Sequence, residues 1–393
     1  KLNRAVSVEE IQDMVENQIM ATGAFDLARR YVRYRYKRSL VRKANTTDNR
    51  ILSLIECNNE DVKQENSNKN PAVNSVQRDY MAGEVSRDLT QRMLLPEDIV
   101  EADKQGIIHF HDSDYYAQHM HNCDLVNLED MLQNGTVISG TMIEKPHSFS
   151  TACNIATQII AQVASNQYGG QSISLAHLAP FVQVSRDKIR AEVEDEMRSI
   201  GFDCPADQLN AIVEGRLKKE ITKGVQTIEY QVITLMTTNG QSPVVTLFLY
   251  LDKDDEYLEE NAQIVMEILR QRYEGIKNEK GVYVTPAFPK LVYVLDEINA
   301  LKGGKYDYIT EFAVKCSAKR LYPDYISAKK MREIYEGNVF SPMGCRSFLS
   351  PWKDENGNYK FEGRFNQGVV SINLPQIGIL AKGDEEKFWA LFD

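Results

Sequence analysis

One cysteine, Cys345, stands in a setting that suits chemistry. It lies in the segment 341–349 (SPMGCRSFL), where proline and glycine precede the thiol and an apolar run follows it. Such a pattern favours a loop that presents the thiol. A turn signal follows at Asn356-Gly357, and a hairpin folded there would bring Cys345 close to Asn366. We therefore expect Cys345 and Asn366 to share one site.

A thiol on a tight loop can be a nucleophile, a redox centre or an abstractor of hydrogen atoms. A nucleophilic cysteine needs a base, usually histidine, and no histidine follows His177, although an earlier one could still supply it. A thiyl radical needs no base. It needs a radical source, an enclosed pocket and a second group that handles proton and electron changes on the substrate.

Two similar segments could bind a polar ligand. The segments 170–173 (GQSI) and 240–243 (GQSP) each lie between an expected helix and an expected strand. Glycine permits close backbone approach and Gln and Ser supply hydrogen bonds, although ordinary turn chemistry explains either segment equally well. The sequence has no glycine-rich loop of the P-loop or dinucleotide-binding kind.

Two His-x-His pairs, at 109–111 and 119–121, superficially suggest a metal site. No cysteine ligand is placed with them, so we expect no metal there. His111 and Ser113 are better candidates for lining a substrate pocket.

Composition narrows the class of protein. The 393 residues carry a net charge of -10, which argues against a general binder of DNA or of anionic membranes but leaves nucleotides as small ligands. The strongest apolar run, 244–251, has the length of a strand and not of a membrane span. Six scattered cysteines indicate a reducing compartment, and no signal peptide opens the chain, so we expect a cytoplasmic protein.

Residues 1–44 have the character of a separate module, with ten basic and five acidic residues. A capping box at 7–10 predicts a helix that ends at Gly23, and a second helix should span 25–43. The basic run at 29–38 could face phosphates or simply form a solvated helix face. The polar stretch 58–70 suggests a linker.

The remainder alternates between helices and strands. We expect a helix from about 72 to 96, strands at 107–111, 243–251 and 281–295, and long helices over 176–200 and 206–237. Alternation on this scale predicts a parallel α/β fold, most simply a barrel.

These residues closely resemble the anaerobic, class III ribonucleoside-triphosphate reductases. The likeness covers about 45–393 and is strongest in the finger-loop segment 343–349 and the segment 366–375 (NQGVVSINLP). Further matching segments are 65–68, 106–116, 121–123, 169–172 and 239–243. Residues 1–44 resemble the last two helices of an ATP-cone, the regulatory nucleotide domain of these enzymes. The resemblance implies a ten-stranded α/β barrel of two five-stranded parallel halves, with the Cys345 finger loop at its centre.

The resemblance also implies roles. Cys345 would be the thiyl that abstracts the ribose 3′ hydrogen, Cys123 the second active-site cysteine, and Asn366 the group that hydrogen-bonds the ribose hydroxyls. From its residue type alone, Cys123 would be a buried structural thiol. Met343 occupies the position that formate-using members give to methionine, which favours formate as the reductant. His111, Ser113, Gln241 and Ser242 are the substrate-binding candidates.

The implied activity is anaerobic reduction of ribonucleoside triphosphates to deoxyribonucleotides, regulated by ATP or dATP and by deoxynucleotide effectors. The implied partners are a radical-SAM activating enzyme with an iron-sulfur cluster and a second copy of the chain, or a higher oligomer. The family's C-terminal glycyl radical motif and four-cysteine zinc site do not occur in this sequence. Two alternatives are another glycyl radical enzyme of the pyruvate formate-lyase type and a nucleotide-sensing regulatory protein with an inactive barrel.

Overall fold

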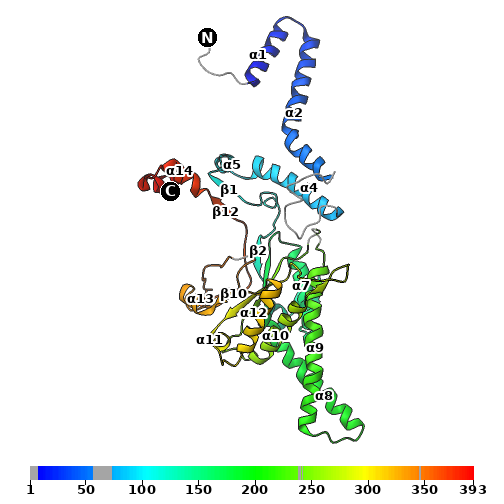
Figure 1. Ribbon diagram of the computed structural model, residues 1–393. Coiled ribbons are helices and arrows are strands. Elements are labelled where there is room, and N and C mark those ends of the chain that lie inside the picture. Colours follow the sequence, from blue (N-terminus) through cyan, green and yellow to red (C-terminus); the bar gives the residue numbers. More distant parts are fainter. Residues whose placement is uncertain (1–7, 56–72, 238–239, 241, 345–346) are drawn as a thin grey trace.

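The computed structural model describes residues 8–55, 73–237, 240, 242–344 and 347–393. Two helices, α1 (Val8–Ala21) and α2 (Phe25–Ile55), form an arm that projects from the α/β body (Figure 1). Both predicted helices are confirmed, but the second continues to Ile55, so no break in secondary structure marks residue 44. The guanidinium group of Arg35 on α2 is paired with the carboxylates of Asp13 and Glu16 on α1. This arginine of the basic run therefore joins the two helices.

The segment after the arm leads to a small two-stranded sheet. α4 (Asn74–Leu89), the π-helical turn η1 (Thr90–Leu94) and α5 (Glu97–Lys104) come first. β1 (Ile108–Phe110) then pairs antiparallel with β12 (Val370–Ile372), and α14 (Leu374–Ala381) and α15 (Glu385–Phe392) follow β12. The predicted strand at 107–111 is confirmed, but it lies outside the main sheet.

The main sheet has six strands in the order β10-β9-β6-β5-β2-β11. Their bounds are β2 (Cys123–Leu125), β5 (Gln171–Ser174), β6 (Val245–Leu249), β9 (Lys290–Leu295), β10 (Asp324–Ser327) and β11 (Arg364–Asn366). The first five strands of this order are parallel, and β11 runs antiparallel to β2. Every residue of β6 is buried, as expected for a central parallel strand covered on both faces.

Helices connect the parallel strands and cover the sheet. Between β2 and β5 lie α6 (Leu128–Gln133), the hairpin of β3 (Thr136–Ile138) and β4 (Thr141–Ile143), and α7 (Phe149–Ala164). Between β5 and β6 lie η2 (Leu175–Leu178), α8 (Ala179–Ser199) and α9 (Ala206–Thr234). The connections after β6 are α10 (Leu258–Glu274), β7 (Ile276–Lys277), β8 (Tyr283–Val284), α11 (Glu297–Ala300), α12 (Asp307–Arg320) and α13 (Ala328–Ile334). The far ends of α8 and α9 project from the body as a long hairpin (Figure 1).

The parallel α/β prediction is confirmed, while the ten-stranded barrel stays a prediction, because the main sheet of the described residues has six strands. The strand expected over 281–295 is instead two strands, β8 and β9. Pro286 and Pro289 lie between them, and proline cannot donate to a strand ladder. In the described part of the chain, no helix is both long and apolar enough to cross a membrane.

Candidate active site

Cys123 and Asn366 face each other across the antiparallel pair of β2 and β11. The backbone N–H of Cys123 donates to the side-chain Oδ1 of Asn366 at 2.8 Å, and the backbone N–H of Asn122 donates to the carbonyl of Asn366 at 3.0 Å. These two bonds tie the strands together at this point. Cys123 is buried, with 7% of its surface exposed.

The sulfur of Cys123 has polar neighbours of its own. It donates to Oδ1 of Asn122 at 2.8 Å and accepts from the backbone N–H of Gly170 at 3.3 Å. A Cβ atom added at Gly169 would lie only 2.7 Å from the sulfur. A residue without a side chain is therefore required there for the chain to pass so close to the thiol.

The finger-loop segment reaches the same place. Met343 is 2% exposed and packs with Cys123 and Leu125, and its N–H donates to the carbonyl of Ser347 at 2.6 Å. Gly344 has φ +54, and a Cβ added to it would lie 2.5 Å from the Cys123 sulfur. The structure thus brings together three of the predicted site residues, Cys123, Asn366 and Met343.

Side chains of the central strands hold this segment. The Ser172 hydroxyl on β5 donates to the carbonyl of Pro342 at 2.5 Å, and the Thr246 hydroxyl on β6 donates to the carbonyl of Gly344 at 3.0 Å. Sequence reasoning assigned Ser172 to a motif for a polar ligand, and its hydroxyl instead bonds to the protein backbone. It missed Thr246 altogether, although a single hydroxyl within the apolar run 244–249 was a usable signal.

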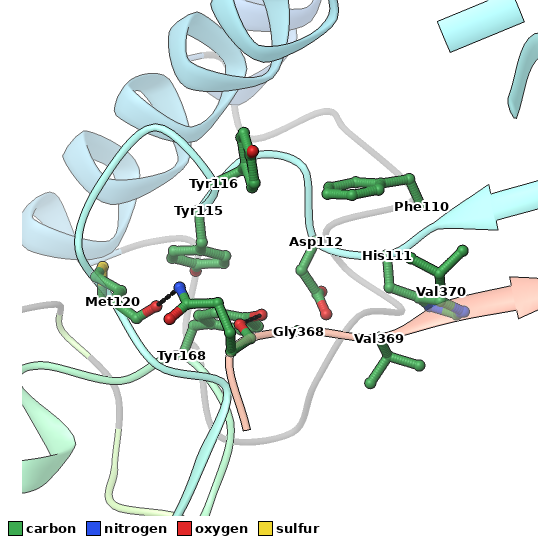
Figure 2. Close-up of a pocket in the computed structure, with 11 residues that line it drawn as sticks. Phe110, His111, Asp112, Tyr115, Tyr116, Met120, Tyr168, Gly368, Val369 and Val370 are labelled. Carbon is green, nitrogen blue, oxygen red and sulfur yellow. Dashed lines mark hydrogen bonds between the residues drawn. The ribbon is translucent and has the colours of Figure 1, made fainter. Parts of the chain in front are cut away.

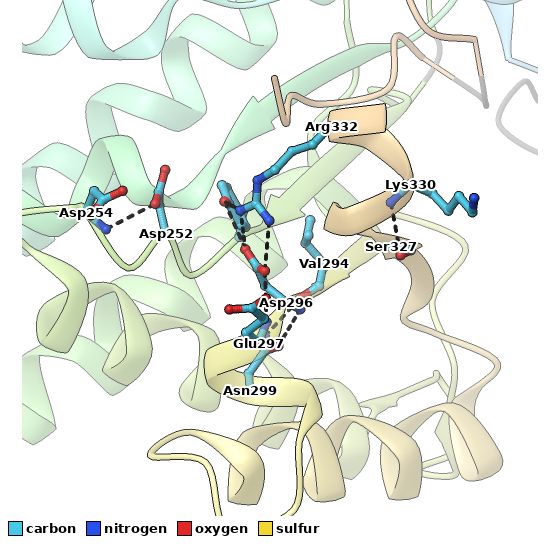
Figure 3. A network of polar contacts seen from close by, with 10 residues as sticks. Asp252, Asp254, Val294, Asp296, Glu297, Asn299, Ser327, Lys330 and Arg332 are labelled. Atoms are coloured by element: carbon cyan, nitrogen blue, oxygen red, sulfur yellow. Dashed lines mark hydrogen bonds and ion pairs between the residues drawn. The ribbon is translucent and has the colours of Figure 1, made fainter. Parts of the chain in front are cut away.

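The helix that precedes the finger-loop segment, α13, is held to the sheet by an ion pair. Arg332 on α13 donates to Oδ1 of Asp296 at 3.0 Å and to the Tyr250 hydroxyl at 3.0 Å, at the carboxyl ends of β9 and β6 (Figure 3). Burial alone would raise the pKa of Asp296, but hydrogen bonds from Arg332 and from the backbone N–H of Glu297 outweigh it and lower the pKa. Asp296 therefore stays ionised and keeps α13 in place.

Two predicted site residues, Cys345 and Gln241, lie outside the described residues, and Ser242 is half-buried. The turn predicted at Asn356-Gly357 is confirmed, because the Gly357 N–H donates to the Asp354 carbonyl at 2.9 Å and Lys353 pairs with Tyr359. The expected approach of Cys345 to Asn366 stays a prediction.

An aromatic cavity of about 210 Å³ lies beside this site (Figure 2). Tyr115 and Tyr168 stack with ring centroids 4.6 Å apart, and the Tyr168 hydroxyl donates to the Gln367 carbonyl at 2.9 Å. Burial raises the pKa of Tyr168. Tyr168 and Gln367 line the cavity, and their sequence neighbours Gly169 and Asn366 contact Cys123. The cavity and the Cys123 site therefore share two chain segments. Sequence reasoning had singled out neither residue.

His111 lines this cavity, and its Nε2 is 2.8 Å from the Ser371 hydroxyl. Ser113, two residues after His111, is buried, but it does not line the cavity. In the second His-x-His pair, His121 is 2.9 Å from the Asp124 carboxylate and stacks on Phe365. Among the described residues, no group of three or more His, Cys, Asp or Glu side chains could hold a metal ion.

Comparison with known families adds the decisive observation. The family of anaerobic ribonucleoside-triphosphate reductases matches residues 65–393, and the ATP cone domain matches residues 1–40. The chain belongs to the anaerobic ribonucleoside-triphosphate reductase family. The predicted N-terminal ATP-cone is confirmed, and a pyruvate formate-lyase type of enzyme is set aside.

Individual members of the reductase family agree with this assignment. The chain is 40% identical over 395 residues to the anaerobic ribonucleoside-triphosphate reductase of Escherichia coli K12, covering 99% of this chain and 53% of the relative. It is 40% identical over 358 residues to that of Enterobacteria phage T4, covering 88% and 56%. The chain thus spans about half the length of the curated relatives it matches.

Solved structures of such reductases share the fold. The anaerobic ribonucleotide reductase from Thermotoga maritima with MES in the active site aligns with a TM-score of 0.52 at 15% identity, over 100% of this chain and 60% of that one. The same enzyme with glycerol in the active site gives 0.51 at 16% identity, over 81% and 49%. At such low identity the likeness supports the mixed α/β architecture alone.

Proposed function

We propose that this chain forms the thiyl-radical site of an enzyme that reduces ribonucleoside triphosphates to 2′-deoxyribonucleoside triphosphates. The observation that carries the proposal is the pairing of Cys123 with Asn366, with Met343 and Gly344 of the finger loop packed on the same sulfur. One thiol, one amide and one loop that leads into Cys345 meet in a buried place. Family membership supplies the reaction that such a set would perform.

In this proposal Cys345 abstracts the ribose 3′ hydrogen, the 2′ hydroxyl leaves as water, and formate is oxidised to carbon dioxide as the substrate radical is reduced. When present, the glycyl radical supplies the unpaired electron. Asn366 is neutral and cannot act as a general base, so it orients hydroxyls. Its Oδ1 already accepts from Cys123, and among the described residues nothing accepts from its Nδ2, which leaves that donor for a ribose hydroxyl. Met343 and Cys123 lie where formate would bind and reduce the substrate radical.

We further propose that the sheet is half of a ten-stranded barrel. The five parallel strands would form one half, and β11, antiparallel to β2, would begin the other. The chain would then divide into the ATP-cone part at 1–44 and the barrel at 45–393. We place the glycyl radical and a structural zinc site in the part of the longer relatives that this sequence does not include.

The proposed ligands and partners follow from the same assignment. The substrate is a ribonucleoside triphosphate, with the cavity of Figure 2 and its His111 beside the reacting sugar and with Ser113, Gln241 and Ser242 as further binding residues. ATP or dATP and deoxynucleotides act as effectors. A radical-SAM enzyme with an iron-sulfur cluster activates a cytoplasmic homodimer, or a higher oligomer, in which α8 and α9 supply contacts.

The test is anaerobic turnover in the full-length reductase after radical activation. We expect formate-dependent formation of deoxynucleotides, reduced at least about a thousandfold by Cys345→Ala and by Cys123→Ala. Cys316→Ala is the matched control, because this thiol on α12 is also buried and lies outside the site. Nucleotide binding without turnover in the wild type would favour the regulatory alternative.

A further inference from the structure

Ser172 and Thr246 sit directly opposite each other on the neighbouring parallel strands β5 and β6. Both are 2% exposed. Their hydroxyls donate to the carbonyls of Pro342 and Gly344, the two residues that flank Met343. A pair of side chains in register thus grips alternate carbonyls of one loop.

We propose that Ser172 and Thr246 are positioning residues, a hydroxyl clamp that fixes the finger loop against the Cys123 sulfur. This inference rests on the proposed thiyl function of Cys345. Cys345 follows Gly344 in the sequence and lies outside the described residues, so chain connectivity alone relates it to the clamp. Consecutive Cα atoms are about 3.8 Å apart, and a firmly held Gly344 therefore limits where the next residue can be.

The clamp provides hydrogen-bond donors for carbonyls of the loop that packs on the sheet. A loop against the face of a sheet cannot use the backbone groups of the strands, because those are engaged in the ladder, and a buried carbonyl without a donor is costly. Ser172 and Thr246 supply donors from the sheet, and the Ser341 hydroxyl is a second donor to the Pro342 carbonyl at 3.1 Å. The Met343 N–H donates to the Ser347 carbonyl within the loop. The backbone is therefore hydrogen-bonded at three consecutive residues, Pro342, Met343 and Gly344.

The choice of residue at 246 is informative by itself. The other residues of β6 are Val, Leu, Phe and Leu, and a valine at 246 would fill the same space. A buried hydroxyl is unfavourable unless it is hydrogen-bonded. The Thr246 hydroxyl donates its hydrogen bond to the Gly344 carbonyl. A threonine at this position of the strand therefore serves to hold the loop. Gly170 adds a close contact, because a Cβ there would lie 3.4 Å from the Gly344 Cα.

The clamp should act on the chemical step. Hydrogen-atom transfer needs reacting atoms about 3–3.5 Å apart, and a misplacement of about 1 Å can cost about a hundredfold. Removing one donor loosens the loop without touching the substrate cavity. The expected effect is therefore a fall in kcat with KM unchanged.

The experiment compares matched variants of the full-length, radical-activated reductase. We expect Thr246→Val to lower kcat by about 10- to 100-fold at unchanged KM, and Thr246→Ser, which keeps the hydroxyl, to stay within about threefold. Thr157→Val is the control, since this 3% exposed hydroxyl donates only to Asn154 within α7. Equal effects of Thr246→Val and Thr157→Val, or a change confined to KM, would overturn the clamp.

Hydrogen–deuterium exchange of the peptide 340–349 in the unactivated protein gives a second readout that needs no turnover. We expect faster exchange in Thr246→Val and in Ser172→Ala, which serves if the first variant does not fold, and unchanged exchange in Thr157→Val. Unchanged exchange in both loop variants refutes the clamp. If the wild type makes no deoxynucleotides but the two loop variants exchange faster than it does, the proposed function is refuted and the clamp is supported.

Discussion

Gly344→Ala tests the close approach of the finger loop to Cys123 more directly than any other substitution. The added Cβ would lie 2.5 Å from the sulfur, whereas non-bonded heavy atoms normally keep about 3.5 Å or more. The loop or the thiol must therefore move by about 1 Å. The left-handed φ of +54 adds backbone strain of about 1 kcal/mol for a residue with a side chain.

Gly357→Ala separates these two costs. Gly357 has φ +82 in the turn at Asn356-Gly357, and a Cβ there meets nothing within 4 Å. We expect it to lower the free energy of unfolding by about 1 kcal/mol through strain alone. Gly344→Ala should cost about 2–4 kcal/mol, because overpacking adds about 1–3 kcal/mol to the strain. Equilibrium urea unfolding measures both values.

Turnover should separate the variants further. A shift of about 1 Å at the loop predicts about a hundredfold loss of kcat for Gly344→Ala, against less than about twofold for Gly357→Ala. Removing the sulfur with Cys123→Ala should relieve most of the overlap and leave a Cβ–Cβ distance of 3.1 Å, so Gly344→Ala should destabilise that background by about 1–2 kcal/mol. The reasoning is refuted if the two glycine variants lose equal stability and activity, or if the Cys123→Ala background brings no relief.

Three further outcomes are expected. Asn366→Asp keeps the acceptor for the Cys123 N–H and should unfold near the wild-type urea concentration while losing most turnover, whereas Asn366→Ala should also lose about 1–3 kcal/mol of stability; equal stability of the two variants would contradict this. Burial raises the pKa of Glu229 on α9 to about 7, with Arg272 offsetting part of the effect. The native state then holds a proton that the unfolded chain has released, so the free energy of unfolding should fall as pH rises from about 5 to about 7, and Glu229→Gln should abolish that fall in urea titrations. Arg332→Met removes the ion-pair partner of the nearly buried Asp296, which keeps its hydrogen bonds from Tyr250 and Glu297, and should cost about 1–3 kcal/mol of unfolding free energy, which a simultaneous Asp296→Asn should partly recover; additive costs would count against the pair.

The sequence predicted most of what depends on local patterns. Capping and periodicity located α1, α8 and α9, and the alternation of elements indicated the parallel sheet. The division of 281–295 into two strands was missed because apolar content outweighed the two prolines that interrupt it. The continuation of α2 to Ile55 was missed because the predicted helix ended with the basic module at residue 44, whereas no proline or glycine interrupts residues 44–55.

The site was less accessible to local reasoning because its contacts are non-local. Cys123 and Asn366 are 243 positions apart, and only register in the sheet makes them neighbours. Nothing about the residue type of Cys123 distinguishes it from the buried Cys153 or Cys316. Family resemblance supplied that assignment. Thr246 was overlooked because a threonine inside a strand is ordinary by propensity, and its use appears only when its hydroxyl is traced to Gly344.

The arrangement explains why a reactive thiol would be carried on a loop and yet held by strands. The backbone of a strand residue is fixed by the ladder and cannot leave the plane of the sheet. A loop can reach the sulfur of Cys123, but without restraints it would adopt many positions. Here the loop contributes carbonyls that need donors, and β5 and β6 contribute hydroxyls that need acceptors. Each satisfies the other, so the geometry of the rigid sheet is transferred to the loop at the two residues beside Met343. The close approach of Gly344 to the Cys123 sulfur further limits the positions that this residue can adopt.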